Sequence, residues 1–219
     1  MPKHQVGRTQ IVWGSLIASM TAVGALLLMS DAASIPSMPA PAMALAGQGD
    51  RTEGGIRAVL STSVPLDHGR WDSIVIHDSG STSGSPESIS RDHEDQGLNG
   101  LGYDFVIANG RGAPDGQIHV GYRWDQQIAG AHTTGPNAEL YNRHAIGICL
   151  VGDGDRRGFS DTQLARVTEL VRTLCEEFSI PPERVLLNRD VAPTSSPGRL
   201  FPEAEFRARL RTGLDLATP

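Results

Sequence analysis

The side chains with the clearest capacity for metal chemistry are seven histidines and two cysteines. Imidazole, thiolate and carboxylate are the usual protein ligands of zinc. His77 ends a short apolar run and Asp78 follows it directly, so two possible ligands are adjacent in the sequence. If this run is a strand, however, the two side chains point to opposite faces. Lysine chemistry is excluded from the body of the chain, because the only lysine is Lys3.

Two cysteines are too few for a disulfide-dense scaffold or a cysteine-rich zinc module. Cys149 lies in a continuous apolar run and Cys175 on the apolar face of a predicted helix, so both are expected to be buried free thiols. A disulfide between them is the alternative, but a strand packed on a helix rarely brings two Cα atoms close enough. The glycine-rich stretch 110–116 and the acidic stretch 152–155 lack the context of phosphate or calcium loops, and we interpret both as turns.

Strands and helices alternate along the part of the chain that carries these side chains. A capping box of Ser160 and Gln163 opens a helix with apolar residues at helical spacing, and Ser85 with Pro86 opens an earlier helix that Gly97 ends. This alternation predicts the α/β class, with a mixed central β-sheet flanked by helices. The predicted strands span residues 72–77, 103–108, 117–121, 145–151 and 184–187, and a closing helix spans residues 202–210.

The amino end has the features of a targeting segment. Residues 11–30 form an uncharged apolar run that is long enough to cross a bilayer as a helix, and cations precede it. We expect a signal anchor whose amino end stays in the cytoplasm, and the alternative is a signal peptide cut after Ala32 or after Ala46. In both cases residues 1–30 direct the rest of the chain across the cytoplasmic membrane.

Composition separates a linker from a folded domain. Residues 31–68 are rich in Pro, Ala, Ser and Gly and predict a linker without a core, which leaves residues 69–219 as the domain. The net charge is −6, from 19 Lys and Arg against 25 Asp and Glu. A negative chain argues against nucleic acid as a partner, because nucleic-acid binding needs a basic surface.

Six ordered segments between Trp71 and Phe206 resemble one protein family. They read IVIHDSG, NGLGYDFVIANG, GQIHVGYRW, GAHTTGPN, HAIGICLVGDG and RDVAPTSSPGRLFP. The set is similar to the zinc-dependent N-acetylmuramoyl-L-alanine amidases of the second type, the related peptidoglycan recognition proteins and the amidase-type phage lysozyme. The resemblance implies their fold, and peptidoglycan as the partner. It also implies a zinc-activated water that cuts the amide between muramic acid and the first alanine of the stem peptide.

The functional residues of the family carry over only in part. Members hold zinc through a His that ends the first strand, a His before Arg-Asp-Val and a Cys before Pro-Gly, and a Tyr and a Lys or Thr assist. His77 matches the first zinc position, Tyr103 matches the Tyr and Thr194 matches the Thr variant, whereas Asn188 and Ser196 stand at the other two zinc positions. A neutral amide oxygen suits calcium better than zinc, and a neutral hydroxyl is not a usual zinc ligand.

The departure from the family pattern favours a binding protein over an enzyme. We expect an exported domain that grips the stem peptide without hydrolysing it and without a cofactor, since family members with Ser at the Cys position are known to act in this way. The expected substrate contacts are Tyr103, His132, Thr194 and Asn188, although His132 is equally well explained as a hydrogen-bonded loop residue.

Two alternatives remain open. The first is an active zinc amidase in which Asp78 or Asp190 replaces the missing ligands and Tyr103 and Thr194 assist catalysis. The second is a regulatory domain that docks an unidentified protein. Zinc-dependent cleavage would identify the first alternative, and retained binding of peptidoglycan would separate the proposed function from the second.

Overall fold

The computed structural model describes residues 55–214, which fold around a five-stranded sheet with the strand order β3-β2-β4-β1-β5. Strand β4 pairs in parallel with β1 and β2, β5 pairs in parallel with β1, and β3 is antiparallel to β2. The predicted α/β class with a mixed central sheet is confirmed. The strands are β1 (Ser73–Asp78), β2 (Phe105–Ile107), β3 (Ile118–Val120), β4 (Ala145–Leu150) and β5 (Val185–Leu187).

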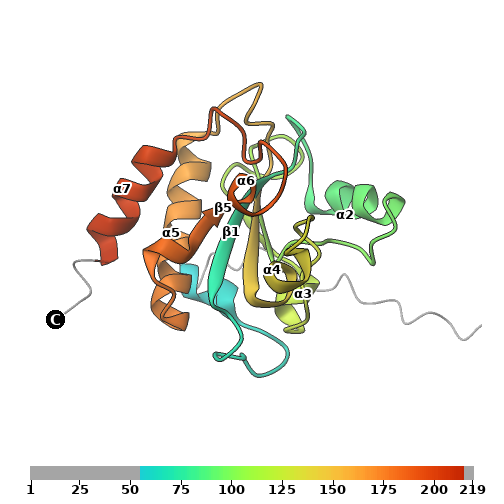
Figure 1. Ribbon diagram of the computed structural model, residues 1–219. Coiled ribbons are helices and arrows are strands. Elements are labelled where there is room, and N and C mark those ends of the chain that lie inside the picture. The colour runs from blue at the N-terminus through green and yellow to red at the C-terminus, as the bar shows by residue number, and fades with distance from the viewer. Residues whose placement is uncertain (1–54, 215–219) are drawn as a thin grey trace, which may run out of the picture. The chain divides into compact units, whose positions relative to one another are not determined.

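Helices cover both faces of the sheet, with α5 and α7 on one side and α2 on the other (Figure 1). A parallel strand covered on both faces needs apolar side chains in both directions, which explains why β1 and β4 are continuous apolar runs. The helices are α2 (Pro86–Asp95), α3 (Tyr122–Asp125), α4 (Ala138–His144), α5 (Asp161–Phe178), α6 (Asn188–Val191) and α7 (Glu203–Leu214), with 3-10 turns η2 (Ile56–Leu60) and η3 (Pro182–Arg184).

The two capped helices begin where the sequence predicts. At α5 the Ser160 side chain accepts from the Gln163 backbone while the Gln163 side chain accepts from the Ser160 backbone, and Ser85 and Ser88 repeat this arrangement at α2. Helices α3, α4 and α6 were not predicted. They are too short for an apolar repeat to be recognised in the sequence, and they form because their neighbours hold them.

The sheet separates two groups of buried side chains. The larger group lies on the α5 side and includes Ile74, Ile76, Ile146 and Ile148, which pack with the apolar face of α5. The smaller group lies on the opposite side and consists of Ile89, Leu101, Tyr103, Val106, Cys149 and Val151. Since side chains alternate along a strand, His77 shares the face of the smaller group.

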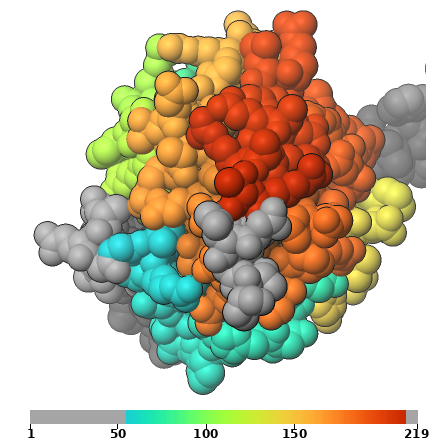
Figure 2. Space-filling view, turned by 90° about the vertical axis from the view of Figure 1, so that its left-hand side faces the viewer, coloured from blue at the N-terminus to red at the C-terminus, as the bar shows by residue number. Residues whose placement is uncertain are grey.

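The domain begins earlier than the sequence analysis placed it. Within the predicted linker of residues 31–68, Val59 and Leu60 are 2% and 5% exposed and belong to the larger core. Arg57 also pairs with Glu176 and Glu177 of α5, and η2, in cyan, lies beside the orange of α5 in Figure 2. The linker assignment is therefore corrected for this stretch, where tertiary contacts hold a segment too short to show a periodic pattern.

The predicted anchor or signal peptide of residues 1–30, and the linker up to residue 54, lie outside the described residues. Within residues 55–214, no helix has both the length and the apolar character that a membrane span requires.

Candidate functional site

His77 lies at the carboxyl end of β1 and is 1% exposed. It is in register with Cys149 on the neighbouring strand β4. The rings of Tyr103 and His132 lie next to it, with centroids 5.1 Å and 5.0 Å from the His77 ring. Asp78 follows on the other face of the strand, where its carboxylate accepts from the Gly154 backbone N–H at 2.8 Å.

The two histidines are joined by a hydrogen bond whose direction follows from a third group. His77 Nε2 lies 3.1 Å from His132 Nδ1, and His132 Nε2 lies 3.2 Å from the Ala145 carbonyl oxygen. A carbonyl can only accept, so Nε2 of His132 carries the hydrogen and Nδ1 of the neutral ring is an acceptor. His77 Nε2 is therefore the donor to His132.

Burial keeps both imidazoles neutral. Desolvation lowers the pKa of His132 to about 4. Desolvation also lowers the pKa of His77 well below its ordinary value, and the neighbouring His132 and His93 lower it further. At neutral pH the pair consists of two uncharged rings, which is the state that the hydrogen bond between them requires.

The residues at the other two zinc positions of the sequence pattern are also hydrogen-bonded. Asn188 begins α6, and its Oδ1 accepts from Thr133 Oγ1 at 3.0 Å. Ser196 Oγ accepts from the Asp78 backbone N–H at 3.0 Å. Thr194 is exposed, and its hydroxyl oxygen accepts from the Ser196 backbone N–H at 3.2 Å.

Tyr103 is largely enclosed by the same cluster. Its ring lies between those of His77 and His93, at 5.1 Å and 5.2 Å, and it belongs to the same buried group as Cys149. Burial raises the pKa of the Tyr103 phenol well above its ordinary value, with Cys149 and Asp78 adding to the effect. Burial likewise raises the pKa of the Cys149 thiol. The phenol and the thiol are therefore both neutral.

The structure brings the residues predicted from the sequence into one connected set. His77 contacts His132, and Thr133, the neighbour of His132, reaches Asn188. Ser196 joins the set through the backbone of Asp78, and Thr194 joins it through Ser196. His132 itself is 7% exposed, and its Nε2 is hydrogen-bonded to the Ala145 carbonyl oxygen.

The family model for N-acetylmuramoyl-L-alanine amidase, Amidase_2, matches residues 67–199. The chain belongs to this family. Within it, the endolysin of Escherichia phage T7 is 30% identical over 134 residues, which cover 58% of this chain and 80% of the endolysin. The endolysin of Enterobacteria phage K11 is 30% identical over 110 residues, 48% of this chain and 64% of the relative, so the match spans just under two thirds of that protein.

Recognition proteins are relatives of this amidase-family chain as well. Peptidoglycan-recognition protein 2 of Holotrichia diomphalia is 30% identical over 132 residues, 58% of this chain and 67% of the relative. Among solved structures, the endolysin amidase LysCS of Clostridium intestinale aligns with a TM-score of 0.51 and 26% identity, covering 69% of this chain and 91% of LysCS. The peptidoglycan recognition protein SA of Apis mellifera aligns with a TM-score of 0.50 at 23% identity, covering 62% and 81%, and shows the shared fold alone. The family and fold implied by the six segments are confirmed, and the function class is peptidoglycan-related amidase or recognition.

The zinc of the amidase family does not fit the donor set of this chain. The three family positions supply one imidazole, one amide and one hydroxyl, whereas zinc prefers imidazole, thiolate and carboxylate. The Asp190 carboxylate, like that of Asp78, is already used, because it accepts from the Leu187 backbone N–H at 2.9 Å. Across residues 55–214, no group of three or more His, Cys, Asp or Glu side chains is placed to hold a metal ion.

Two residues near this site were not identified from the sequence. Asp104 is fully buried, its Oδ2 accepts from the Gly147 backbone N–H at 2.8 Å and its Oδ1 has no hydrogen-bond partner. Desolvation raises the pKa of Asp104 to about 7. Asp104 could have been identified from the sequence, because it is the only carboxylate within the otherwise apolar segment 103–108. Thr133 gave no such signal, since its role comes from contact with Asn188, which is distant in the sequence.

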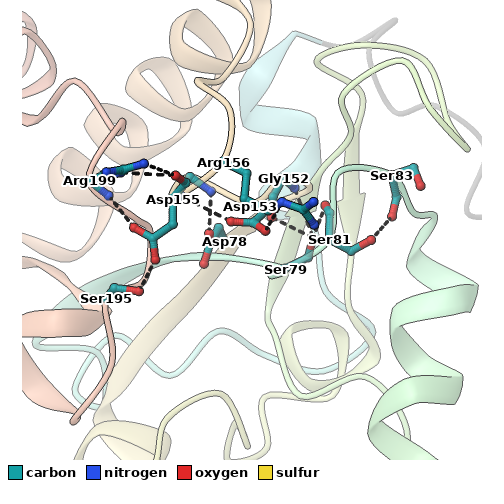
Figure 3. A network of polar contacts seen from close by, with 11 residues as sticks. Asp78, Ser79, Ser81, Ser83, Gly152, Asp153, Asp155, Arg156, Ser195 and Arg199 are labelled. Atoms are coloured by element: carbon teal, nitrogen blue, oxygen red, sulfur yellow. Dashed lines mark hydrogen bonds and ion pairs between the residues drawn. The ribbon is translucent and has the colours of Figure 1, made fainter.

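A network of polar contacts joins the loops that follow β1, β4 and α6 (Figure 3). The Ser195 hydroxyl donates to the Asp155 carboxylate, and the Arg199 guanidinium donates to the Asp155 carbonyl oxygen at 3.0 Å. Ser79 Oγ accepts from the Gly152 backbone N–H at 3.0 Å. This network holds the loop that carries Ser196 against the loop that follows β4.

Proposed function

We propose that this amidase-family domain binds the stem peptide of peptidoglycan and does not hydrolyse it. The observation that carries the proposal is the state of the three family zinc positions. His77, Asn188 and Ser196 are each hydrogen-bonded to another part of the protein. Two of these side chains are neutral oxygen groups, which are not usual zinc ligands.

Loss of the metal would remove the nucleophile. Zinc lowers the pKa of a bound water from about 15.7 to about 7, which supplies hydroxide at neutral pH. The neutral rings and oxygens of this site give no comparable activation. Burial raises the pKa of the Tyr103 phenol well above its ordinary value, so it is protonated and does not act as a general base at neutral pH.

Recognition can survive the loss of hydrolysis, because binding requires only a surface of suitable shape with suitable hydrogen-bonding groups. We propose Asn188 and Thr194 as accessible contacts, with Tyr103 and His132 as the buried support beneath them. The family match to residues 67–199 and the relation to a peptidoglycan recognition protein support this assignment.

The test uses the full chain, purified in a mild non-ionic detergent because of its apolar amino-terminal run. We expect it to co-sediment saturably with insoluble peptidoglycan and to bind a soluble muramyl peptide in calorimetry. Thr194→Ala and Asn188→Ala should each weaken binding about tenfold, the effect of one or two lost hydrogen bonds. Thr212→Ala, an exposed threonine of α7, is the matched control and should change nothing.

Two results would replace the proposal with one of the alternatives. Retention of about one zinc per chain after desalting, together with cleavage of the muramic acid–alanine amide, would make the chain an active amidase. Failure to bind peptidoglycan or muramyl peptide at any concentration would leave a protein-docking domain.

We also propose that the domain acts outside the cytoplasmic membrane, anchored by residues 11–30. This proposal rests on the apolar run and the cations before it. Fusion of alkaline phosphatase to the carboxyl end should be active, since that enzyme needs export, and the protein should fractionate with membranes. A soluble, shortened product in the exported fraction would indicate a cleaved signal peptide instead.

A further inference from the structure

A second candidate site lies where the loops after β1, β2 and β4 meet. It is a cavity of 340 Å³, with walls that include Thr82, Asn109, Arg111, Asp153, Arg157 and Phe159. These residues follow the carboxyl ends of three parallel strands. The cavity is separate from the His77 cluster, with which it shares no lining residue.

The topology makes this edge a favourable place for a ligand. From β1 the chain passes to α2 on one face of the sheet, and from the adjacent strand β4 it passes to α5 on the other face (Figure 1). The two connections therefore separate and leave a crevice between them. In open α/β sheets ligands bind in such crevices, outside the carboxyl ends of the strands.

Two guanidinium groups in this cavity have no partner among the residues that the structure describes. Across residues 55–214, neither Arg111 nor Arg157 has a hydrogen bond or ion pair from its guanidinium. Most other arginines described, such as Arg189, Arg207 and Arg199, donate to carboxylates or carbonyl oxygens. Two unpaired cations at one cavity form a positive centre that an external anion can complete.

Two hydrogen bonds hold the backbone of Arg111 in place. Its N–H donates to the Asn109 side chain at 3.1 Å, and its carbonyl oxygen accepts from the Gly84 N–H at 2.9 Å. Gly112 has a φ of +112°, and a Cβ there would lie 2.6 Å from the Gly84 carbonyl oxygen, so only glycine allows this close approach. The loop that carries Arg111 is thereby held against the loop that follows β1.

The second arginine stands on an equally ordered turn. The backbone N–H of Arg157 donates to the Asp153 carbonyl oxygen at 2.9 Å. Asp153 is the only carboxylate among the described residues that line the cavity, and it is used within its own turn. Its Oδ1 accepts from the Asp155 N–H, and its Oδ2 faces Arg156 at 3.9 Å, an arrangement visible in Figure 3.

We infer that this cavity is a binding site for the oxyanion group, carboxylate or phosphate, of a small ligand, and that Arg111 and Arg157 hold it. A guanidinium presents paired N–H donors that match both groups. Phe159 and Val151 supply an apolar wall for the rest of the ligand, and the positive end of the α5 helix dipole adds to the attraction.

Titration calorimetry of the full chain in non-ionic detergent tests the inference with two probes, inorganic phosphate and the dicarboxylate glutarate. We expect saturable binding of at least one probe, weakened at least tenfold in the double variant Arg111→Gln, Arg157→Gln. The control is Arg156→Gln, which removes one positive charge from the loop that carries Arg157 but from outside the cavity lining, and it should change the affinity less than twofold.

The pattern of binding identifies the source of the anion. Phosphate alone would indicate a phosphorylated ligand, and glutarate alone would indicate a carboxylate such as a peptide end. No saturable binding of either probe overturns the inference. Equal weakening by Arg156→Gln also overturns it, because it would show only the effect of net charge. Both cavity arginines are exposed, and an unchanged thermal midpoint would confirm that the double variant is folded.

Discussion

His77 donates its Nε2 hydrogen to Nδ1 of His132 over 3.1 Å, at the position where the sequence pattern of the family places a zinc ligand. The only family ligand that this chain keeps is thus held by a second imidazole, through a bond that uses one of its two ring nitrogens. The relation also explains why His132 is buried, since its ring lies over Gly147 and its other nitrogen donates to Ala145.

Removal of the acceptor should destabilise the fold. In His132→Ala the Nε2–H of His77 would stay buried without a partner, and a cavity would open above Gly147. We expect a loss of about 2–4 kcal/mol in the free energy of unfolding. Urea unfolding followed by tryptophan fluorescence measures this loss. His68→Ala, at an exposed histidine, should cost less than about 1 kcal/mol, and equal losses in the two variants would contradict the argument.

Restoring the family ligands should restore a metal site. In the double variant Asn188→His, Ser196→Cys, the chain would present two imidazoles and a thiolate, the donor types that zinc prefers. We expect about one zinc per chain by elemental analysis after desalting, and less in each single variant. Addition of His77→Ala should abolish retention. Absence of zinc in the double variant would contradict the prediction, because it would show that these three positions do not form a zinc site in this fold.

The buried histidines should make the fold sensitive to acid. The pKa of His132 is about 4 in the folded chain against an ordinary value of 6.5. Below pH 6.5 the unfolded chain binds a proton that the folded chain does not, so stability falls as the pH drops toward about 4. The effect amounts to roughly 3 kcal/mol for His132. Urea midpoints between pH 7.5 and 4.5 should fall more steeply in the wild type than in His132→Ala, and parallel slopes would contradict this assignment.

Asp104 should make the fold less stable as the pH rises, which is the opposite of the effect of the histidines. Its pKa rises from 3.8 to about 7 on folding. Between these values the unfolded chain has lost a proton that the folded chain keeps, so the contribution of Asp104 to stability falls as the pH rises from about 4 to about 7, by up to about 4 kcal/mol. Asp104→Asn should remove this trend and should be more stable than the wild type at pH 8. The buried histidines change stability with pH in the opposite direction. The quantity to compare is therefore the difference in the free energy of unfolding between the wild type and Asp104→Asn at each pH.

The cysteines should stay reduced and unreactive. Both are free and buried, and burial raises the pKa of Cys175 to about 12. Because the thiolate is the reactive form, we expect almost no reaction with a disulfide reagent in the native chain and reaction of both thiols in guanidinium chloride. The expectation of free thiols is confirmed by the structure. Rapid reaction of the native protein at Cys149 would show that the face of the sheet around Tyr103 opens.

The framework of this fold can be predicted from local patterns along the chain. Apolar runs at β1 and β4 predicted the central strands because strands covered on both faces must be apolar throughout, and the capping box at Ser160 predicted the start of α5 because it depends on residues three positions apart. The family followed from six local segments. The changes at Asn188 and Ser196 were readable for the same reason, since the residues flanking them kept the family pattern.

The hydrogen-bond partners of the altered site depend on contacts between segments that are distant along the chain. The partners of His77, Asn188 and Ser196 are His132, Thr133 and the backbone of Asp78, between 55 and 118 residues away along the chain. Hydrogen bonds across such separations leave no local pattern, because they arise from the packing of loops on the sheet. The same holds for η2, a five-residue turn that is held by the burial of Val59 and Leu60 and shows no periodic pattern. It holds also for the two arginines that strand order brings to one cavity.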